Sequence, residues 1–117
     1  MTPDELRVRT KAFALRVVRL YRSLPRTADA QVMGKQLLRC GTSVAANYRA
    51  SCRARSRAEF AARIGIVVEE ADESGFWLEM LADAENVKMS LLKELLQESK
   101  ELTAIFTATQ QTVRKRG

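Results

Sequence analysis

Arginine residues are concentrated near the middle of this chain. Five of them lie between positions 49 and 63: Arg49, Arg53, Arg55, Arg57 and Arg63. A guanidinium group can donate two parallel hydrogen bonds to a phosphate, so such a cluster is suited to contacting a nucleic-acid backbone. Alternatively, these arginines pair with the chain's own acids or lie in solvent along a helix face. No known nucleic-acid-reading motif decides between the two, and charge alone is a weak signal.

Charge is also divided between the two halves of the chain. Residues 1–63 carry 14 Lys and Arg against 4 Asp and Glu, residues 64–117 carry 6 against 10, and the formal net charge is +6. Such an asymmetry is typical of a surface that meets a partner: nucleic acid, an acidic protein or the acidic half of an identical subunit. The further cations that could extend the central cluster are Arg16, Arg19, Arg22, Arg114, Lys115 and Arg116.

The acidic segment 69–73 (EEADE) is the one pattern that suggests a metal site. Di-iron sites in helical bundles also use two inward-facing Glu-x-x-His pairs, and this chain contains no His. On a helix, Glu69, Asp72 and Glu73 would point away from the apolar side. Only Glu70 would lie at its edge. The pattern therefore favours an acidic patch that faces solvent or another subunit, and it predicts no metal site.

The absence of histidine also removes the most common general base and every Ser–His or Cys–His nucleophile. Cys40 has no identifiable base to activate it, so a structural thiol is the simpler interpretation. We expect a protein that is not an enzyme and that needs no cofactor.

Apolar residues recur with a helical period along four segments. We expect helices at about residues 4–24, 30–52, 57–84 and 91–115. Pro25 ends the first, and Ser56 with Glu59 forms a capping box that starts the third. Ser90 is the expected cap of the fourth. Long helices joined by short connections predict an all-α fold, an antiparallel up-down-up-down four-helix bundle that forms a single domain over residues 1–117.

Two details of the apolar pattern concern packing between helices. Gly41 lies among other small residues of the expected second helix, so another helix can approach closely there. Phe76 and Trp77 lie away from the centre of the apolar side of the third helix. Large aromatics on two sides of one helix predict that it is covered on more than one side, by the rest of the bundle or by another subunit.

Cys40 and Cys52 are the only cysteines. On one helix they would lie roughly 18 Å apart along its axis, too far for a disulfide. We therefore expect two buried or half-buried free thiols in a reducing cytoplasm. No apolar run approaches the roughly 20 residues that a membrane-spanning helix needs. The N-terminal residues lack the basic and apolar regions of a signal peptide, which favours a cytoplasmic protein with no membrane partner.

Much of the chain resembles one known family. The resemblance is carried by residues 36–50 (QLLRCGTSVAANYRA), 52–60, 69–73 and 77–79. These stretches are similar to the four-helix-bundle proteins encoded in intervening sequences of bacterial 23S ribosomal RNA genes, once grouped as S23 ribosomal proteins. The accessory variability protein of diversity-generating retroelements shares that fold. The chain departs from the pattern only at Ala45 and Ala50, where many relatives have Gly and Glu.

The resemblance implies a bundle that assembles as a ring of five identical subunits. In the retroelement branch it implies a basic surface that binds nucleic acid and the reverse transcriptase, whereas in the intervening-sequence branch the biochemical function is largely unassigned. It carries over no catalytic residue. The positions proposed as contacts to RNA or DNA are Arg16, Arg19, Arg49, Arg53, Arg55 and Arg57.

A ring gives the divided charge a second explanation. Cyclic assemblies join one surface of a subunit to a different surface of its neighbour, so a basic face from the first two helices could meet an acidic face from the last two. The expected subunit-interface residues are Glu69, Asp72, Glu73, Phe76 and Trp77.

Two hypotheses for function follow. In the first, the chain is a non-enzymatic homo-oligomeric bundle, a pentamer by resemblance, whose remaining basic surface binds RNA or DNA. In the second, it is a protein-interaction scaffold or accessory subunit, for example of a reverse transcriptase, with no direct role in nucleic-acid binding. Binding to RNA or DNA that weakens steeply with salt is expected of the first alone.

Overall fold

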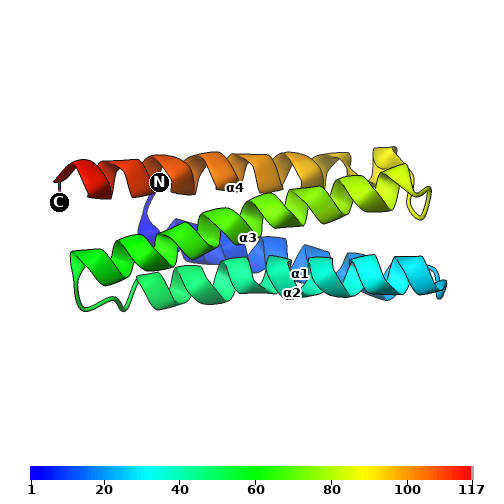
Figure 1. The fold of residues 1–117 in the computed structure, drawn as a ribbon, viewed down its shortest axis with the longest axis horizontal. Coiled ribbons are helices and arrows are strands. Elements are labelled where there is room, and N and C mark those ends of the chain that lie inside the picture. Colours follow the sequence, from blue (N-terminus) through cyan, green and yellow to red (C-terminus); the bar gives the residue numbers. More distant parts are fainter. Residues whose placement is uncertain (117) are drawn as a thin grey trace.

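The computed structural model describes residues 1–116 as four long helices. They are α1 (Pro3–Ser23), α2 (Ala28–Ser51), α3 (Arg57–Asp83) and α4 (Met89–Arg116), and residues 1–116 contain no strand. Successive helices run antiparallel (Figure 1), so the predicted all-α up-down-up-down bundle is confirmed. The observed helix bounds lie within two residues of the expected ones.

Local sequence explains where two of the helices begin. Thr2 caps α1 by accepting a hydrogen bond from the Glu5 amide at 3.1 Å. Ser56 caps α3 in the same way, accepting from the Glu59 amide at 3.0 Å as the capping box predicts. The Glu59 carboxylate reaches one residue beyond the cap, where it accepts from the Arg55 amide at 3.0 Å.

The predicted cap of the fourth helix is wrong. α4 begins at Met89, so Ser90 lies inside its first turn. The helix starts earlier because the Lys88 carbonyl already accepts a hydrogen bond from the Leu91 amide at 2.9 Å. Val87 packs against the core just before this turn and fixes where the chain enters the helix.

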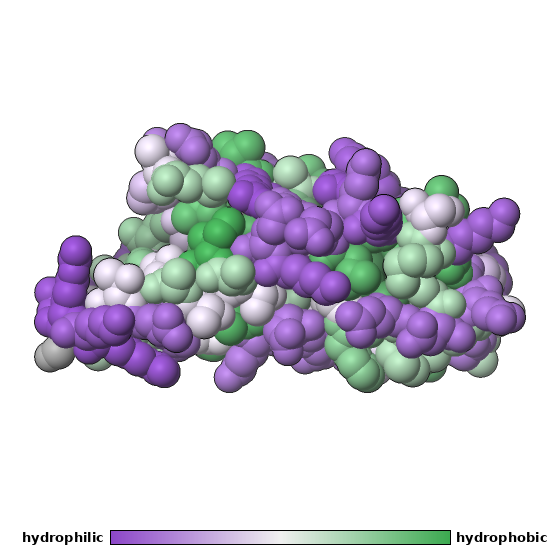
Figure 2. Space-filling model, turned by 90° about the horizontal axis from the view of Figure 1, so that it is seen from above, coloured by the Kyte–Doolittle hydropathy of each residue, from purple (hydrophilic) through white to green (hydrophobic). Residues whose placement is uncertain are grey.

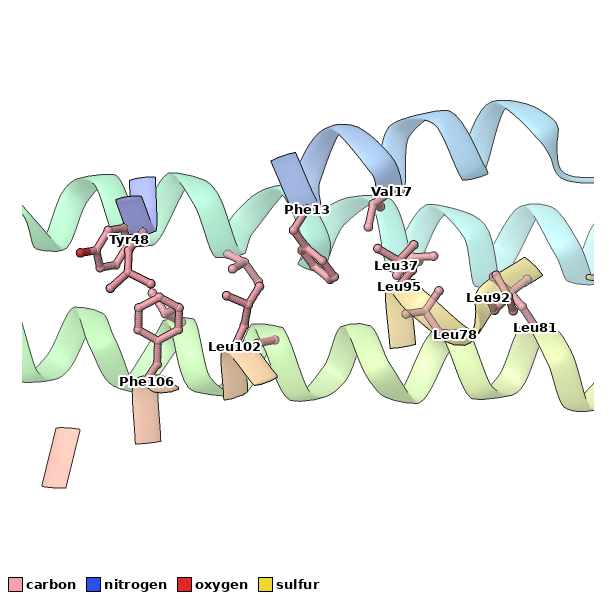
Figure 3. Packing of buried hydrophobic residues seen from close by; sticks show 14 of the residues in the cluster. Phe13, Val17, Leu37, Tyr48, Leu78, Leu81, Leu92, Leu95, Leu102 and Phe106 are labelled. Carbon is pink, nitrogen blue, oxygen red and sulfur yellow. The ribbon is translucent and has the colours of Figure 1, made fainter. Parts of the chain in front are cut away.

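The apolar core runs along the bundle and draws on all four helices. Its large, fully buried side chains include Phe13, Val17, Leu37, Val44, Ile64, Val67, Leu78, Leu81, Leu92, Leu102 and Phe106. Figure 3 shows such side chains directed into the space between the helices. Toward one end the rings of Tyr48 and Phe106 meet, with their centroids 5.1 Å apart. Burying a side chain of this size contributes about 1.5–3 kcal/mol, so the core dominates the stability of the bundle.

Helix order brings three separate chain segments to one end of the molecule. α1 packs on α2, α2 on α3 and α3 on α4, whereas α1 and α4 touch only sparsely. The N-terminus, the connection between α2 and α3 and the C-terminus all lie at the same end of a bundle that measures 46 × 21 × 19 Å (Figure 1). We call it the basic end: the start of α1, residues 49–63 and the last turn of α4.

Both cysteines are free, as the sequence predicts. Cys40 is buried, but Cys52 is exposed, which corrects the expectation of two buried or half-buried thiols. Cys52 is exposed because it is the C-cap residue of α2, where the helix leaves the core and turns toward α3. Within residues 1–116 we find no helix that combines the length and the apolar character needed to cross a membrane.

Candidate nucleic-acid interface

The connection between α2 and α3 fixes the backbone of the central arginine cluster. The Arg53 amide donates to the Ala50 carbonyl at 3.0 Å, and the Arg55 amide is held by the Glu59 carboxylate. The side chains of Arg53, Arg55 and Arg57 are nevertheless exposed. An ordered turn thus presents three cations to solvent at the basic end.

The last turn of α4 brings further cations to the same place. Arg57 donates from Nη1 to the main-chain carbonyl oxygen of Arg116 at 2.5 Å. Arg114, Lys115 and Arg116 are exposed there. In Figure 2, hydrophilic side chains gather at the left of the molecule, around the end of α4. Positive charge at a helix C-terminus also interacts favourably with the helix dipole.

Arg49 lies on the neighbouring side of α2, where it faces α1. A groove of about 440 Å³ separates the two helices, and its charged residues are Arg7, Lys11 and Arg49. The floor of the groove consists of the small residues Thr42, Ala45 and Ala46. The positive surface therefore continues from the basic end along the flank between α1 and α2.

Most arginines of the basic end have no acidic partner among residues 1–116. Those that form no ion pair within residues 1–116 are Arg49, Arg53, Arg55, Arg57, Arg63, Arg114 and Arg116. The nearby acids Asp4, Glu5 and Glu59 lie in the first turns of α1 and α3. There they stabilise each helix by interacting with the positive end of its dipole. Among residues 1–116 this end therefore carries more positive than negative charge, which attracts polyanions.

Other arginines are held in ion pairs between helices. Arg9 donates to the two Glu98 carboxylate oxygens at 2.7 and 2.6 Å and to Glu101 at 3.0 Å. These contacts raise the pKa of Arg9 above its ordinary value, and the hydrogen bond with Glu98 contributes most. Arg39 pairs with Glu73 at 2.5 Å. Because these pairs join α1 to α4 and α2 to α3, we assign them to the fold and not to the candidate interface.

Two of the six predicted contact residues lie apart from the others. Arg16 Nη2 is 3.9 Å from Glu94 Oε2, and Arg16 follows Arg7 by nine residues, which is roughly 14 Å along α1. Arg19 is exposed one turn further from the basic end. The predicted contacts that the structure brings together are Arg49, Arg53, Arg55 and Arg57.

The predicted subunit-interface residues occupy two sides of α3. Glu73 and Trp77 lie on the side toward α2, where Trp77 Nε1 donates to Glu73 Oε2 at 3.0 Å. This hydrogen bond, together with Arg39, holds the pKa of Glu73 below its usual range. Glu69 and Asp72 are exposed. The acidic segment is therefore partly used within the subunit.

Phe76 lies on the adjoining side of α3, toward α4. Its side chain is 50% exposed, and its ring meets that of Trp77 edge-on, with centroids 4.9 Å apart. Phe76 borders a groove of about 360 Å³ between α3 and α4, whose charged residues are Asp72, Glu79 and Lys100. This apolar ring with acidic neighbours is a surface suited to a basic, partly apolar partner.

The sequence matches the model of one protein family, the 23S rRNA-intervening sequence protein, over residues 4–108. The chain belongs to this family. Its structure is similar to the crystal structure of a protein of unknown function from the S23 ribosomal protein family of Bacteroides thetaiotaomicron VPI-5482, with 32% sequence identity and a TM-score of 0.87. The match covers 95% of this chain and 99% of that one. No curated protein matches the chain. The resemblance drawn from the sequence is confirmed.

In this member of the 23S rRNA-intervening sequence protein family, two residues of the positive surface were not among the predicted contacts. They are Arg7 and Lys11, which line the groove beside Arg49. Their spacing of four residues places them on one side of α1, and that signal was present in the sequence. The sequence did not show which side of α2 is covered by α1, and so it did not show that these two residues lie beside Arg49.

The described part of this family member presents cations at the basic end, and one of its two free thiols, that of Cys52, is exposed. No cluster of three or more His, Cys, Asp and Glu side chains within residues 1–116 could hold a metal ion. The buried Cys40 thiol lies 3.3 Å from the hydroxyl of Ser74, which donates to it. Burial raises the pKa of Cys40, so it remains a neutral thiol at physiological pH.

Proposed function

We propose that the chain is a non-enzymatic, homo-oligomeric helical bundle that binds RNA or DNA through its basic end. One observation carries the proposal: the arginines of the connection between α2 and α3 meet the C-terminal turn of α4 without acidic partners among residues 1–116. Like charges that a folded protein holds close together repel one another, and a bound polyanion relieves this repulsion.

The expected mode is contact with the phosphate backbone. Arginine and lysine side chains at the basic end can each neutralise one phosphate and release its counterions. Each such contact adds about 0.7 to 0.9 to the slope of log affinity against log salt concentration. Contact by Arg49, Arg53, Arg55 and Arg57 alone therefore predicts a slope of about −3 to −4.

The test compares nucleic-acid binding by two variants, one that loses three positive charges at the basic end and one that loses three elsewhere. The triple variant Arg53→Gln, Arg55→Gln, Arg57→Gln should lose about 2 to 3 units of the salt slope. A matched control replaces Arg22, Arg26 and Lys35, which are exposed and lie toward the other end, and should keep the slope. Unchanged binding by the first triple variant would contradict the proposal.

The proposal also includes assembly into a closed ring, with five subunits by family resemblance. The acidic surface around Phe76 is one candidate face. The other is the outer side of α1, where Val8 and Leu15 are 72% and 44% exposed beside Arg19. A heterologous contact joins two different surfaces. These two faces differ in charge, and both carry exposed apolar side chains, which suits such a contact.

Mass measurement by light scattering tests this assembly. The wild-type chain should have several times the mass of one subunit, and Phe76→Ser should lower that mass. Val32→Ser is the matched control, since Val32 is 63% exposed on α2 and belongs to neither face. A wild-type chain that stays a monomer at physiological salt would refute the ring.

The exposed Phe76 also supports a second candidate function, an accessory subunit that docks another protein through the groove between α3 and α4. This function predicts no affinity for RNA or DNA at low salt. It also predicts a protein partner whose binding is lost in Phe76→Ser and kept in the triple arginine variant.

A further inference from the structure

A hollow opens at the basic end, between the start of α1, the end of α2 and α4. Its volume is about 490 Å³, which falls within the range of small-molecule sites. Apolar side chains form much of its wall, among them Leu6, Tyr48 and Phe60. No acidic side chain lines it. Such a cavity can take up a flat, uncharged group.

The hollow adjoins the basic groove between α1 and α2. Arg7 lines both cavities, so it stands at their junction. Lys11 and Arg49 line the groove, which likewise has no acidic residue in its wall. A polyanion lying in the groove would therefore pass three cations and arrive at the mouth of an apolar cavity.

We propose that the groove and the hollow together bind single-stranded nucleic acid, with phosphates beside Lys11, Arg7 and Arg49 and one unpaired base inside the hollow. This inference rests on the proposed function and adds the class of nucleic acid. A duplex keeps its bases paired and stacked, so it can offer only phosphates to the basic end. A single strand can offer both a phosphate and a free base face.

The groups at the hollow suit an uncharged base. Burial is the main cause that raises the pKa of Tyr48 to about 12, and a hydrogen bond with Cys52 is the second. The Tyr48 hydroxyl is therefore neutral at physiological pH. The Tyr48 ring is only 4% exposed and packs on Phe106, so the half-buried Phe60 is the aromatic side chain of this wall that a base can contact. Removing an aromatic side chain that stacks on a base typically weakens single-strand binding by about 5- to 150-fold.

Arg7 is available for a phosphate although it pairs with Asp4. The Asp4 side chain is 84% exposed, and exposed ion pairs contribute little. A phosphate that approaches along the groove can therefore replace Asp4 as the partner of Arg7, at small cost to the fold.

Cys52 supplies a reporter inside the hollow. It lines the cavity and is exposed, whereas Cys40, the other cysteine, is buried. We expect saturating ten-nucleotide oligo(dT) or oligo(U) to slow alkylation of Cys52 by N-ethylmaleimide at least tenfold. A blunt DNA duplex at saturation should slow it less than twofold, because its bases stay in the stack. The duplex also controls for the change in local potential that any bound polyanion causes.

A variant that fills the hollow gives an independent measurement. Ala54 lines the cavity, so Ala54→Trp should weaken oligo(dT) binding about tenfold while the salt slope stays unchanged. Ala62→Trp is the matched control, since Ala62 is exposed on α3 and lines neither cavity. Circular dichroism of both variants checks that the bundle is intact.

The outcomes separate this inference from the function on which it rests. Protection of Cys52 by either single strand, with loss of affinity in Ala54→Trp, supports the inference, and the strand that protects more identifies RNA or DNA. Single strands that bind without protecting Cys52 overturn the inference and leave the proposed function standing. Failure of every nucleic acid to bind overturns both.

Discussion

The guanidinium of Arg57 donates a hydrogen bond to the main-chain carbonyl oxygen of Arg116, at 2.5 Å, and so ties the first residue of α3 to the last turn of α4. The two residues are 59 positions apart in the sequence. Their contact places the C-terminal Arg-Lys-Arg beside the arginines of the connection between α2 and α3. The positive charge at the basic end therefore comes from two distant segments that the fold brings together.

The first prediction concerns that C-terminal contribution. Ending the chain after Val113 removes three cations, so the salt slope for nucleic-acid binding should fall by about 2 to 3 units. The core lies elsewhere, so the free energy of unfolding should change by no more than about 0.5 kcal/mol. Filter binding between 50 and 200 mM salt and urea unfolding measure the two quantities. Arg57→Lys keeps the charge and should keep the slope, whereas an unchanged slope in the truncated chain would exclude the C-terminal turn from binding.

The second prediction compares two helical glycines. A Cβ atom at Gly41 would lie 2.9 Å from Cγ2 of Val17, and Val17 is fully buried in the core. Crowding of this kind costs about 1–3 kcal/mol, which exceeds the gain of about 1 kcal/mol in helix propensity. Gly41→Ala should therefore lower the melting temperature by several degrees.

Gly65 provides the matched control for Gly41. A Cβ atom there would meet only the side-chain amide of Gln110, at 2.7 Å from Nε2, and the end of that flexible side chain can move. Gly65→Ala should therefore raise the free energy of unfolding by up to about 1 kcal/mol. Thermal unfolding followed by circular dichroism measures both variants. Equal effects at the two positions would show that close packing of α1 on α2 is not what Gly41 provides.

The third prediction concerns Glu85, which has a φ of 62°. It follows the end of α3, where the Asn86 amide donates to the Leu81 carbonyl at 2.9 Å, as in a Schellman motif. The left-handed conformation costs a non-glycine residue about 1–2 kcal/mol. Glu85→Gly should therefore stabilise the protein by about 1 kcal/mol, and Glu85→Ala should not. Denaturant unfolding that ranks alanine equal to glycine would show that the backbone at this position is not strained.

The sequence predicted the helices and their arrangement because both depend on periodic patterns of apolar residues. It predicted the close approach at Gly41 for the same reason, since small residues in phase with the core mark a helix contact. It was wrong at Ser90, where residues just before the helix, among them Val87, fix its start. It was also wrong about Cys52, because the exposure of a helix cap depends on the direction of the following turn.

The candidate site was only partly predictable. The cluster at Arg49 to Arg57 is local in sequence and was found. Arg16 and Arg19 were grouped with it by charge, but position along α1 separates them. Arg7 and Lys11 required knowledge of which helices are neighbours. The pairing of Glu73 with Arg39 and Trp77 likewise depends on contacts between helices, and charge patterning does not reveal such contacts.

The last prediction follows from that pairing. A hydrogen bond from Trp77, and next the contact with Arg39, lower the pKa of Glu73. A carboxyl with a lowered pKa in the folded state stabilises the fold when ionised, so its contribution is present at neutral pH. The contribution is lost as the pH falls below 4.5, the ordinary value for glutamate.

Glu73→Gln should therefore reduce the free energy of unfolding at pH 7 by about 1 kcal/mol, an amount limited by solvent screening of this partly exposed group. The difference from the wild type should shrink as the pH falls below 4.5. Urea unfolding at pH 7 and pH 3 measures it. Glu69→Gln is the matched control, since Glu69 is exposed and forms no ion pair within residues 1–116. A difference for Glu73→Gln that grows toward acid pH would show that the carboxylate destabilises α3 instead of anchoring it to α2.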